Sequence, residues 1–307
     1  RIHHIPIRNN NYSQSCFQSD GIIHTLIFTI FQVQIRKFMS TINILFIGDI
    51  VGKPGFEMIL TWLPTFQQKY KTDAIIVNGE NTNDGKGILQ KEGEALFAQG
   101  VRVITGGNHT WDKAPAQEYL KNEPRVLRPQ NYPRGAHGNG HYIFETSKGK
   151  VAVLNLQGRT FMPIIDCPFR SAEWVLANKI RTETKVIVVD FHAEATAEKQ
   201  ALAYHLDGKV SAILGTHTHV QTNDDRIFPN GTAYISDVGM TGPYNSVIGM
   251  KVATALNRFL YLTPQKYETA LDDVHVCGVF LKIDTETGKT LEIEKFIFPE
   301  FDKTAKS

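Results

Sequence analysis

The stretch Ser211-Ala-Ile-Leu-Gly-Thr-His-Thr-His-Val220 decides how the rest of the chain is interpreted. Residues 211–214 are predicted to form a short buried strand that ends at Gly215. His217 and His219 follow at alternate positions, and in an extended segment side chains two residues apart point to the same side. Because imidazole is a common ligand of transition metals, the pair predicts a metal site just beyond the strand. Taken alone, the pair could equally be two surface histidines on a loop.

Strands and helices alternate after residue 40. Apolar runs predict strands at residues 42–47, 74–81 and 101–109, and helical spacing of apolar residues predicts helices at 54–70 and 88–98. Pro64 weighs against the second half of the first helix. The order strand, helix, strand, helix, strand is typical of a parallel α/β layer.

Polar side chains that can bind a metal stand at each of these strand ends. Asp49 follows the first strand, Glu80 and Asn81 end the second, and Asn108 and His109 end the third. Singly, the aspartate could be a helix N-cap and the asparagines turn residues. Open sheets of this type bind ligands beyond the carboxyl ends of their strands. We therefore expect the five side chains to lie together with the histidine pair.

The second half of the chain supplies one more histidine at a strand end. The pattern predicts a loop at 127–140, a hairpin of 141–145 with 150–156, a helix at 168–180, a strand at 185–192, a helix at 197–206, a glycine-bearing loop at 241–249 and a closing hairpin of 274–284 with 291–298. Trp174, Val175 and Leu176 are expected to face the core. His192 ends its strand, although a buried core histidine is the alternative for this position alone.

Composition excludes several classes of protein. The chain has 33 Lys and Arg against 31 Asp and Glu, and residues 1–38 carry a net +3, which leaves −1 for the remainder. A nearly neutral body argues against a protein that grips long nucleic acid. Three cysteines without CxxC spacing exclude a disulfide scaffold and a zinc ribbon, and they favour a reducing, cytoplasmic setting.

Residues 1–38 are predicted to be an extension outside the folded domain, which we expect to span 39–307. The apolar run at 21–31 is too short to cross a bilayer as a helix, and no clear small-residue cleavage site follows it. Met39 stands directly before the first strand and is a candidate natural start. We find no internal repeat and no domain boundary after residue 40, and we expect no association with a membrane.

The candidate site mixes carboxylate, amide and imidazole groups. Its members are Asp49, Glu80, Asn81, Asn108, His109, His192, His217 and His219. This mixture suits Mn, Fe or Zn better than Mg or Ca, and the absence of cysteine argues against a structural zinc. The set is larger than one metal needs, so two divalent transition metal ions that share a carboxylate are predicted. Two such ions can clamp a phosphoryl group and activate water.

The order of these motifs resembles the calcineurin-like metallophosphoesterase superfamily. The motifs are Gly48-Asp-x-x-Gly52, Gly79-Glu-Asn81, Gly107-Asn-His109, the lone His192, and Gly215-x-His-x-His219. Many members of the superfamily carry a histidine where this chain has Val51, and a bridging aspartate where it has Glu80.

Both departures resemble the YmdB-like bacterial branch, the 2′,3′-cyclic-nucleotide phosphodiesterases. The segments Asn78-Gly-Glu-Asn81, Gly107-Asn-His-Thr-Trp-Asp112 and Asp237-Val-Gly-Met-Thr-Gly-Pro243 are similar to that branch in particular. The resemblance covers about residues 42–299. It implies an α/β fold, a four-layer sandwich of two mixed β-sheets flanked by helices, and it makes residues 39–307 a metallophosphoesterase domain.

The resemblance also implies a role for each site residue. Asp49, Glu80 and His219 would hold the first metal, and Glu80, Asn108, His192 and His217 the second, with Glu80 as the bridge. Asn81 would lie close to the first metal or to the phosphate. His109 would not bind a metal; it would protonate the leaving oxygen or stabilise the phosphate as a cation.

The implied function is metal-dependent hydrolysis of 2′,3′-cyclic nucleotides, in which a metal-bridging hydroxide attacks phosphorus and His109 protonates the leaving oxygen. The alternatives are a phosphomonoesterase on the same site and a metal-binding regulatory protein with vestigial hydrolysis. The expected partner is a small phosphodiester or nucleotide, and a homo-oligomer is left open. Asp112 is expected to be an exposed acid at a helix start rather than a partner of His109. His137, His141, His205 and His275 are expected to be structural or on the surface.

Overall fold

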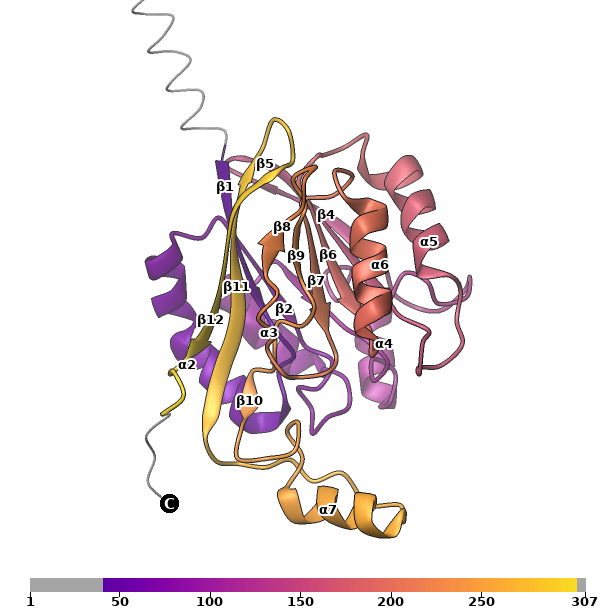
Figure 1. Ribbon diagram of the computed structural model, residues 1–307, viewed down its shortest axis with the longest axis vertical. Coiled ribbons are helices and arrows are strands. Elements are labelled where there is room, and N and C mark those ends of the chain that lie inside the picture. The colour runs from indigo at the N-terminus through magenta and orange to yellow at the C-terminus, as the bar shows by residue number, and fades with distance from the viewer. Residues whose placement is uncertain (1–40, 303–307) are drawn as a thin grey trace, which may run out of the picture. The chain divides into compact units, whose positions relative to one another are not determined.

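The computed structural model of the protein describes residues 41–302 (Figure 1). The predicted extension at 1–38 lies outside the described residues. Within the described part of the chain no helix combines the length and the apolar character that crossing a membrane requires.

The first sheet is mixed. Its strand order is β10 (Gly242–Pro243), β11 (Val274–Asp284), β1 (Thr41–Ile47), β2 (Ala74–Asn78) and β3 (Val103–Thr105), with β12 (Thr290–Phe298) paired to β11. Strands β1, β2 and β3 are parallel, as predicted, because helices connect them. β11 is antiparallel to β1, to β10 and to β12, and the predicted closing hairpin of β11 and β12 is confirmed.

The second sheet is also mixed. Its order is β4 (His141–Thr146), β5 (Gly149–Gln157), β6 (Ile187–His192), β7 (Ala212–Thr216), β9 (Ala233–Ile235) and β8 (Arg226–Ile227). The four central strands β5, β6, β7 and β9 are parallel, and the edge strands β4 and β8 are antiparallel to their neighbours. The hairpin predicted around residue 148 is the β4–β5 pair.

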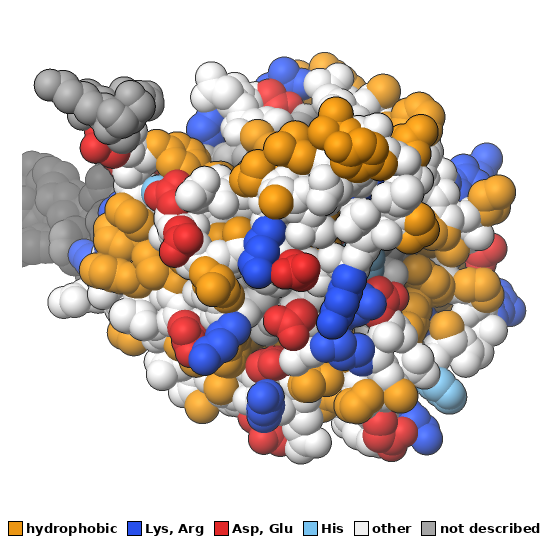
Figure 2. Space-filling model, turned by 90° about the horizontal axis from the view of Figure 1, so that it is seen from below, with side chains coloured by type: hydrophobic (Ala, Val, Ile, Leu, Met, Phe, Trp, Pro, Cys, Tyr) orange, Lys and Arg blue, Asp and Glu red, His pale blue; other side chains and the backbone are white. Residues whose placement is uncertain are grey.

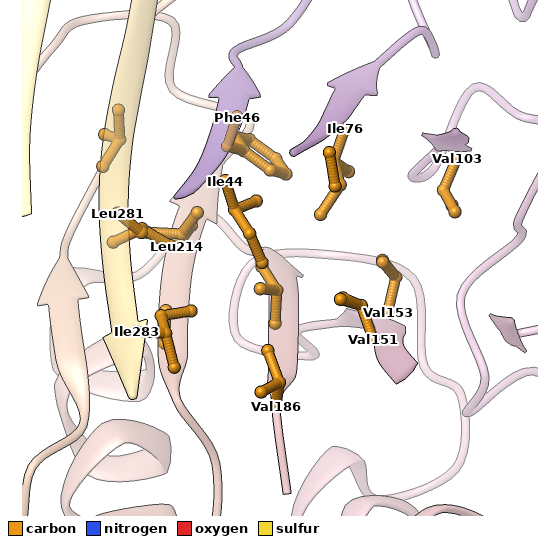
Figure 3. Close-up of a cluster of buried hydrophobic side chains, with 14 of the residues drawn as sticks. Ile44, Phe46, Ile76, Val103, Val151, Val153, Val186, Leu214, Leu281 and Ile283 are labelled. Atoms are coloured by element: carbon orange, nitrogen blue, oxygen red, sulfur yellow. The ribbon is translucent and has the colours of Figure 1, made fainter. Parts of the chain in front are cut away.

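The two sheets pack face to face over a core of buried aliphatic side chains (Figure 3). Alternation along β1 explains how one strand serves two layers. Ile42, Ile44 and Phe46 point between the sheets, whereas Leu45 and Ile47 point to the outer side. A strand buried on both faces needs a continuous apolar run, and this is the run that the sequence has.

Helices cover both outer faces, so the predicted four-layer sandwich is confirmed. α2 (Gly52–Tyr70), α3 (Gln90–Ala98) and α4 (Ala114–Asn122) pack on the first sheet. α5 (Pro168–Val175), a π-helical turn (Leu176–Ile180) and α6 (Thr196–Leu206) pack on the second. α2 continues through Pro64 to Tyr70, so this proline does not end the helix.

Three local expectations are wrong or incomplete. Trp174 is half-exposed, whereas Val175 and Leu176 are buried. Consecutive residues on a helix point about 100° apart, so three in a row cannot all face one core. The strand of the histidine motif does not end at Gly215 but continues to Thr216. Helix α7 (Val252–Tyr261) was not predicted, and of α4 only a start near Asp112 was expected.

α7 lies at the lower end of the described fold, which Figure 2 views from below and where hydrophobic side chains lie between charged ones. Leu256, Phe259 and Leu260 on α7 are at least half-exposed. Its large apolar residues therefore lie outside both the core between the sheets and the cores beneath the outer helices.

Candidate metal centre

The structure brings the predicted donors together from both sheets. Glu80, Asn81 and Asn108 follow β2 and β3 of the first sheet, and Asp49 follows β1. His192 ends β6 of the second sheet. His217 and His219 follow β7, and most of these side chains are buried: Asp49 and His192 are fully buried, and Glu80 is 1% exposed. The strands of both sheets present their carboxyl ends at this edge.

One half of the site is centred on His192. Its Nε2 lies 2.9 Å from Glu80 Oε1, 3.0 Å from Asn108 Oδ1 and 3.0 Å from His217 Nδ1. The ligand atoms of Glu80, His192 and His217 all lie within 4.8 Å of one another. Two imidazoles, a carboxylate and an amide oxygen thus lie close enough together to bind one transition metal ion.

The other half of the site is centred on Asp49. Its Oδ1 lies 3.9 Å from His219 Nε2, too far for a hydrogen bond. Asn81 Nδ2 lies 3.2 Å from His219 Nε2 and 3.1 Å from Glu80 Oε1. Asp49 Oδ1 is buried and has no hydrogen-bond partner in residues 41–302. A buried carboxylate oxygen needs a partner, and a cation between Asp49 and His219 would supply one. Asp49 does not cap α2, whose N-cap is Val51.

The outer ring nitrogen of each histidine is held by an acceptor. His192 Nδ1 lies 2.9 Å from Thr216 Oγ1, His217 Nε2 lies 3.2 Å from Glu194 Oε2, and His219 Nδ1 donates to Ile248 O at 2.9 Å. These contacts place a proton on the outer nitrogen of each ring and turn the inner nitrogen towards the other donors of the site. This is the arrangement by which proteins orient imidazoles as metal ligands.

Charge in the cluster supports the same interpretation. Burial alone would raise the pKa of Glu80, but the charge of His192 holds it down to about 2. Burial would lower the pKa of His192, but Glu80 raises it to about 9. Burial and the neighbouring His192 lower the pKa of His217 to about 3. His192 therefore carries a proton that balances Glu80 at neutral pH, and a bound cation would displace that proton.

The geometry of the histidine motif differs from the expected one. His217 has a φ of 99° and His219 a φ of 66°, so the segment is a turn and not an extended strand. Both imidazoles still reach the site, because the turn carries them there from the end of β7. Backbone with positive φ is unfavourable for residues other than glycine and persists only where surrounding contacts hold it.

A buried ion pair supplies those contacts. Asp237 Oδ2 accepts hydrogen bonds from Thr218 N at 3.0 Å and from Thr218 Oγ1 at 2.7 Å, and it pairs with Lys199 Nζ at 3.0 Å. Its Oδ1 accepts a further bond from Gly239 N at 2.8 Å. Lys199 and Asp237 are at most 2% exposed. The pair therefore anchors the residue between the two histidines.

His109 lies at the edge of the cluster and is partly exposed. Its Nδ1 lies 2.8 Å from Asp112 Oδ2, with the two side chains 40% and 36% exposed. The expectation that Asp112 is only an exposed acid at a helix start is therefore wrong. Asp112 is the partner of His109, and α4 begins two residues later at Ala114. The backbone N–H of His109 points at Glu80 Oε2 at 3.3 Å, which keeps the residue beside the donors.

Three further residues of the site, Asp190, Thr216 and Glu194, were not predicted from the sequence. Asp190 is fully buried on β6 and accepts hydrogen bonds from Thr216 Oγ1, Thr105 Oγ1 and Asn78 Nδ2 at 2.7, 2.5 and 2.9 Å. Burial raises its pKa to about 7. Thr216 connects this carboxyl group to His192. An acid two residues before a strand-end histidine, on the same face of an apolar strand, was the available signal. The third missed residue is Glu194.

The loop that follows residue 240 supports the site through its backbone. Thr241 N donates to Asp49 O at 2.8 Å, and Val51 N donates to Thr241 O at 2.9 Å. Thr241 is fully buried. The loop is thus paired to the Asp49 segment.

Gly107 offers a direct test of how closely the donors pack. A Cβ at this position would overlap Glu80 Oε2 and the ring of His192. We expect Gly107→Ala to push these two groups apart and to lower the metal content of the purified protein, measured by elemental analysis. Metal content equal to that of the wild type, at an unchanged melting temperature, would contradict the proximity of the two groups.

The fold and the donor set define a protein of the metallophosphoesterase type. A family model described as YmdB-like protein matches residues 45–296, and the chain belongs to this family. The 2′,3′-cyclic-nucleotide 2′-phosphodiesterase of Bacillus subtilis is 45% identical over 255 residues, which are 83% of this chain and 96% of that protein.

Solved structures give the same result. A hypothetical protein from Thermus thermophilus is 39% identical, with a TM-score of 0.78 over 84% of this chain and 99% of that chain. A phosphatase from Mycoplasma pneumoniae is 36% identical, with a TM-score of 0.80 over 85% of this chain and 94% of that chain. The resemblance found in the sequence is therefore confirmed.

Proposed function

We propose that this protein is a metal-dependent phosphodiesterase that hydrolyses 2′,3′-cyclic nucleotides. One observation carries the proposal: carboxylate, amide and imidazole donors from both sheets converge at one edge of a YmdB-like fold. The name of the Bacillus subtilis relative supports the choice of substrate.

The proposed ligands divide into two groups that share Glu80. Asp49 and His219 belong with Glu80 to the first metal, and Asn108, His192 and His217 belong with it to the second. The orphaned Asp49 Oδ1 supports the first group, and the contacts of His192 Nε2 support the second. We propose Asn81 as an additional contact of the first metal or of the phosphate. Mn or Fe is the expected metal, with Zn as the alternative.

The residues of this chain then have separable tasks. Two bound divalent cations would neutralise the phosphate and lower the pKa of a water that attacks phosphorus. Asp112 holds Nδ1 of His109, which leaves Nε2 available to donate a proton to the departing ribose oxygen. Thr216, Glu194 and the carbonyl of Ile248 hold the imidazole rings in orientation.

A substrate comparison separates this function from a phosphomonoesterase. After loading with Mn²⁺ or Fe²⁺, we expect a higher kcat/KM for a 2′,3′-cyclic nucleotide than for a nucleoside monophosphate. The reverse order would identify a phosphomonoesterase. Stoichiometric metal with no turnover of either substrate would identify a regulatory protein whose hydrolysis is vestigial.

The setting of the enzyme is part of the proposal. We propose that residues 39–307 form one metallophosphoesterase domain and that 1–38 lie outside it, and the match over residues 45–296 supports this division. Cys167 and Cys277 are free thiols, which favours a cytoplasmic location. A homo-oligomer is compatible with the exposed apolar residues of α7.

A further inference from the structure

A cavity with several charged residues in its lining lies outside the metal centre, since none of the proposed metal ligands borders it. Its volume is about 750 Å³, and its walls include Arg128, Arg134, Arg170, Tyr132 and Trp174. Asp166 is the one carboxylate among the residues that line it. Arg170 Nη1 pairs with Glu173 Oε2 at 3.4 Å, so the excess of positive charge over Asp166 comes from Arg128 and Arg134.

Arg128 is the buried member of this group. It is 8% exposed, and its Nη1 donates to Pro129 O at 2.8 Å and to Gln130 O at 3.2 Å. Its buried Nε has no hydrogen-bond partner in residues 41–302. Burial lowers the pKa of Arg128, and no neighbouring acid offsets this effect. A buried guanidinium without a counter-charge is unfavourable, so an anionic ligand is expected to complete it.

The N-terminus of α5 adds to the positive electrostatic potential of the cavity. Cys167 is the N-cap of this eight-residue helix, and Cys167, Arg170 and Ser171 line the cavity. The first turn contains no acidic residue and instead carries Arg170. A cation is unfavourable at the positive end of a helix, and Glu173, 3.4 Å from Arg170, offsets this effect only in part because the pair is solvent-exposed. A phosphate in the cavity could accept hydrogen bonds both from the free N–H groups of the helix and from the guanidinium groups.

The cavity is connected to the metal centre through one aromatic pair. The rings of Trp111 and Tyr132 are in edge contact with centroids 4.3 Å apart, and Trp111 follows His109 by two residues. Tyr132 Oη donates to Gln157 Oε1 at 3.2 Å, and Gln157 is paired with His192 across β5 and β6. Tyr132 therefore lines the cavity and also contacts residues that neighbour the metal centre.

From these observations we infer that the arginine cavity binds a phosphate group of a nucleotide. Tyr132 and Trp174 offer aromatic faces for a base, and the guanidinium groups offer paired donors for phosphate oxygens. The phosphate can belong to the substrate itself, as a phosphate on the 5′ side of the cyclic nucleotide, or to a separate molecule. Binding of phosphate in the cavity is independent of the reaction at the metal centre, whereas its assignment to the substrate rests on the proposed function.

Binding of phosphate can be measured on the metal-loaded full chain. Arg134 and Arg170 are exposed, so Arg134→Gln and Arg170→Gln are expected to fold normally. By titration calorimetry with inorganic phosphate, we expect two binding events in the wild type, one at the metal centre and one in the cavity, and each variant should weaken only the second by about tenfold or more. Arg128→Lys keeps the positive charge but loses the paired donors of the guanidinium group, so its binding of phosphate should be weakened as well. Arg226→Gln, at an exposed arginine on β8, is the matched control and should bind as the wild type does.

Kinetics then distinguish the two sources of the phosphate. If the cavity holds a substrate phosphate, a 2′,3′-cyclic nucleotide that also carries a 5′-phosphate should have a lower KM than one without it, and Arg134→Gln and Arg170→Gln should abolish the difference. If it holds a separate molecule, the KM values should be equal in all variants while the calorimetric difference remains. Unchanged phosphate binding and unchanged KM values in all arginine variants would overturn the inference. Hydrolysis of the nucleotide without a 5′-phosphate should be the same in every variant, which keeps this test separate from that of the proposed function.

Discussion

His109→Ala is expected to lower the turnover of a 2′,3′-cyclic nucleotide by about 10²–10⁴-fold, the range typical for loss of a general acid. The metal content should stay unchanged, because His109 is not among the proposed metal ligands and is held by Asp112. The ribose oxygen is a poor leaving group and needs a proton as its bond to phosphorus breaks. Steady-state kinetics and elemental analysis of the same preparation provide the measurement.

An activated ester serves as the control for this role. A p-nitrophenyl phosphodiester departs without protonation, so His109→Ala should slow its hydrolysis much less than that of the cyclic nucleotide. Asp112→Asn keeps the imidazole and should reduce turnover less than His109→Ala does. Equal losses on both substrates, or a loss of metal in His109→Ala, would show that the residue does not act as the acid.

Asp237→Asn is expected to lower the free energy of unfolding by about 3–5 kcal/mol, because it leaves the ammonium group of Lys199 buried without a counter-charge. It should also reduce the metal content. Asp237 holds Thr218, and without this anchor the positive φ angles of His217 and His219 are no longer enforced. Denaturant unfolding and elemental analysis check the two effects.

Two comparisons separate the anchor from a general loss of charge. Lys199→Met removes the cation but keeps the bonds from Asp237 to Thr218, so we expect it to retain more metal than Asp237→Asn does. Lys53→Met breaks an exposed pair with Glu57, with side chains 78% and 63% exposed, and should leave stability nearly unchanged. If Asp237→Asn were as stable and as metal-rich as Lys53→Met, the turn would not depend on the buried pair.

The sheets and most helices follow from local patterns in the sequence. The apolar run of β1 predicts a strand buried on both faces, and the structure shows its side chains shared between two cores. The order of the strand-end motifs predicts which side chains lie together, because parallel strands present their carboxyl ends at one edge. Local pattern is sufficient where the position of a residue depends on its own element.

The same reasoning fails where distant contacts decide the geometry. His217 and His219 alternate as strand residues do, yet Asp237 holds the residue between them in a turn. The bond from His109 to Asp112 depends on the conformation of a loop. The apolar spacing of α7 carries no information on burial, since Leu256 and Phe259 remain exposed.

The division of the donors between two sheets determines when the donor set becomes complete during synthesis on the ribosome. Asp49 lies near the start of the described fold, whereas His219 is separated from it by strands β2 to β7. A nascent chain that ends before His217 holds only part of the donor set. Contacts this distant along the chain form late in folding, once the sandwich has closed. We therefore expect the cell to load the cations only into completed chains.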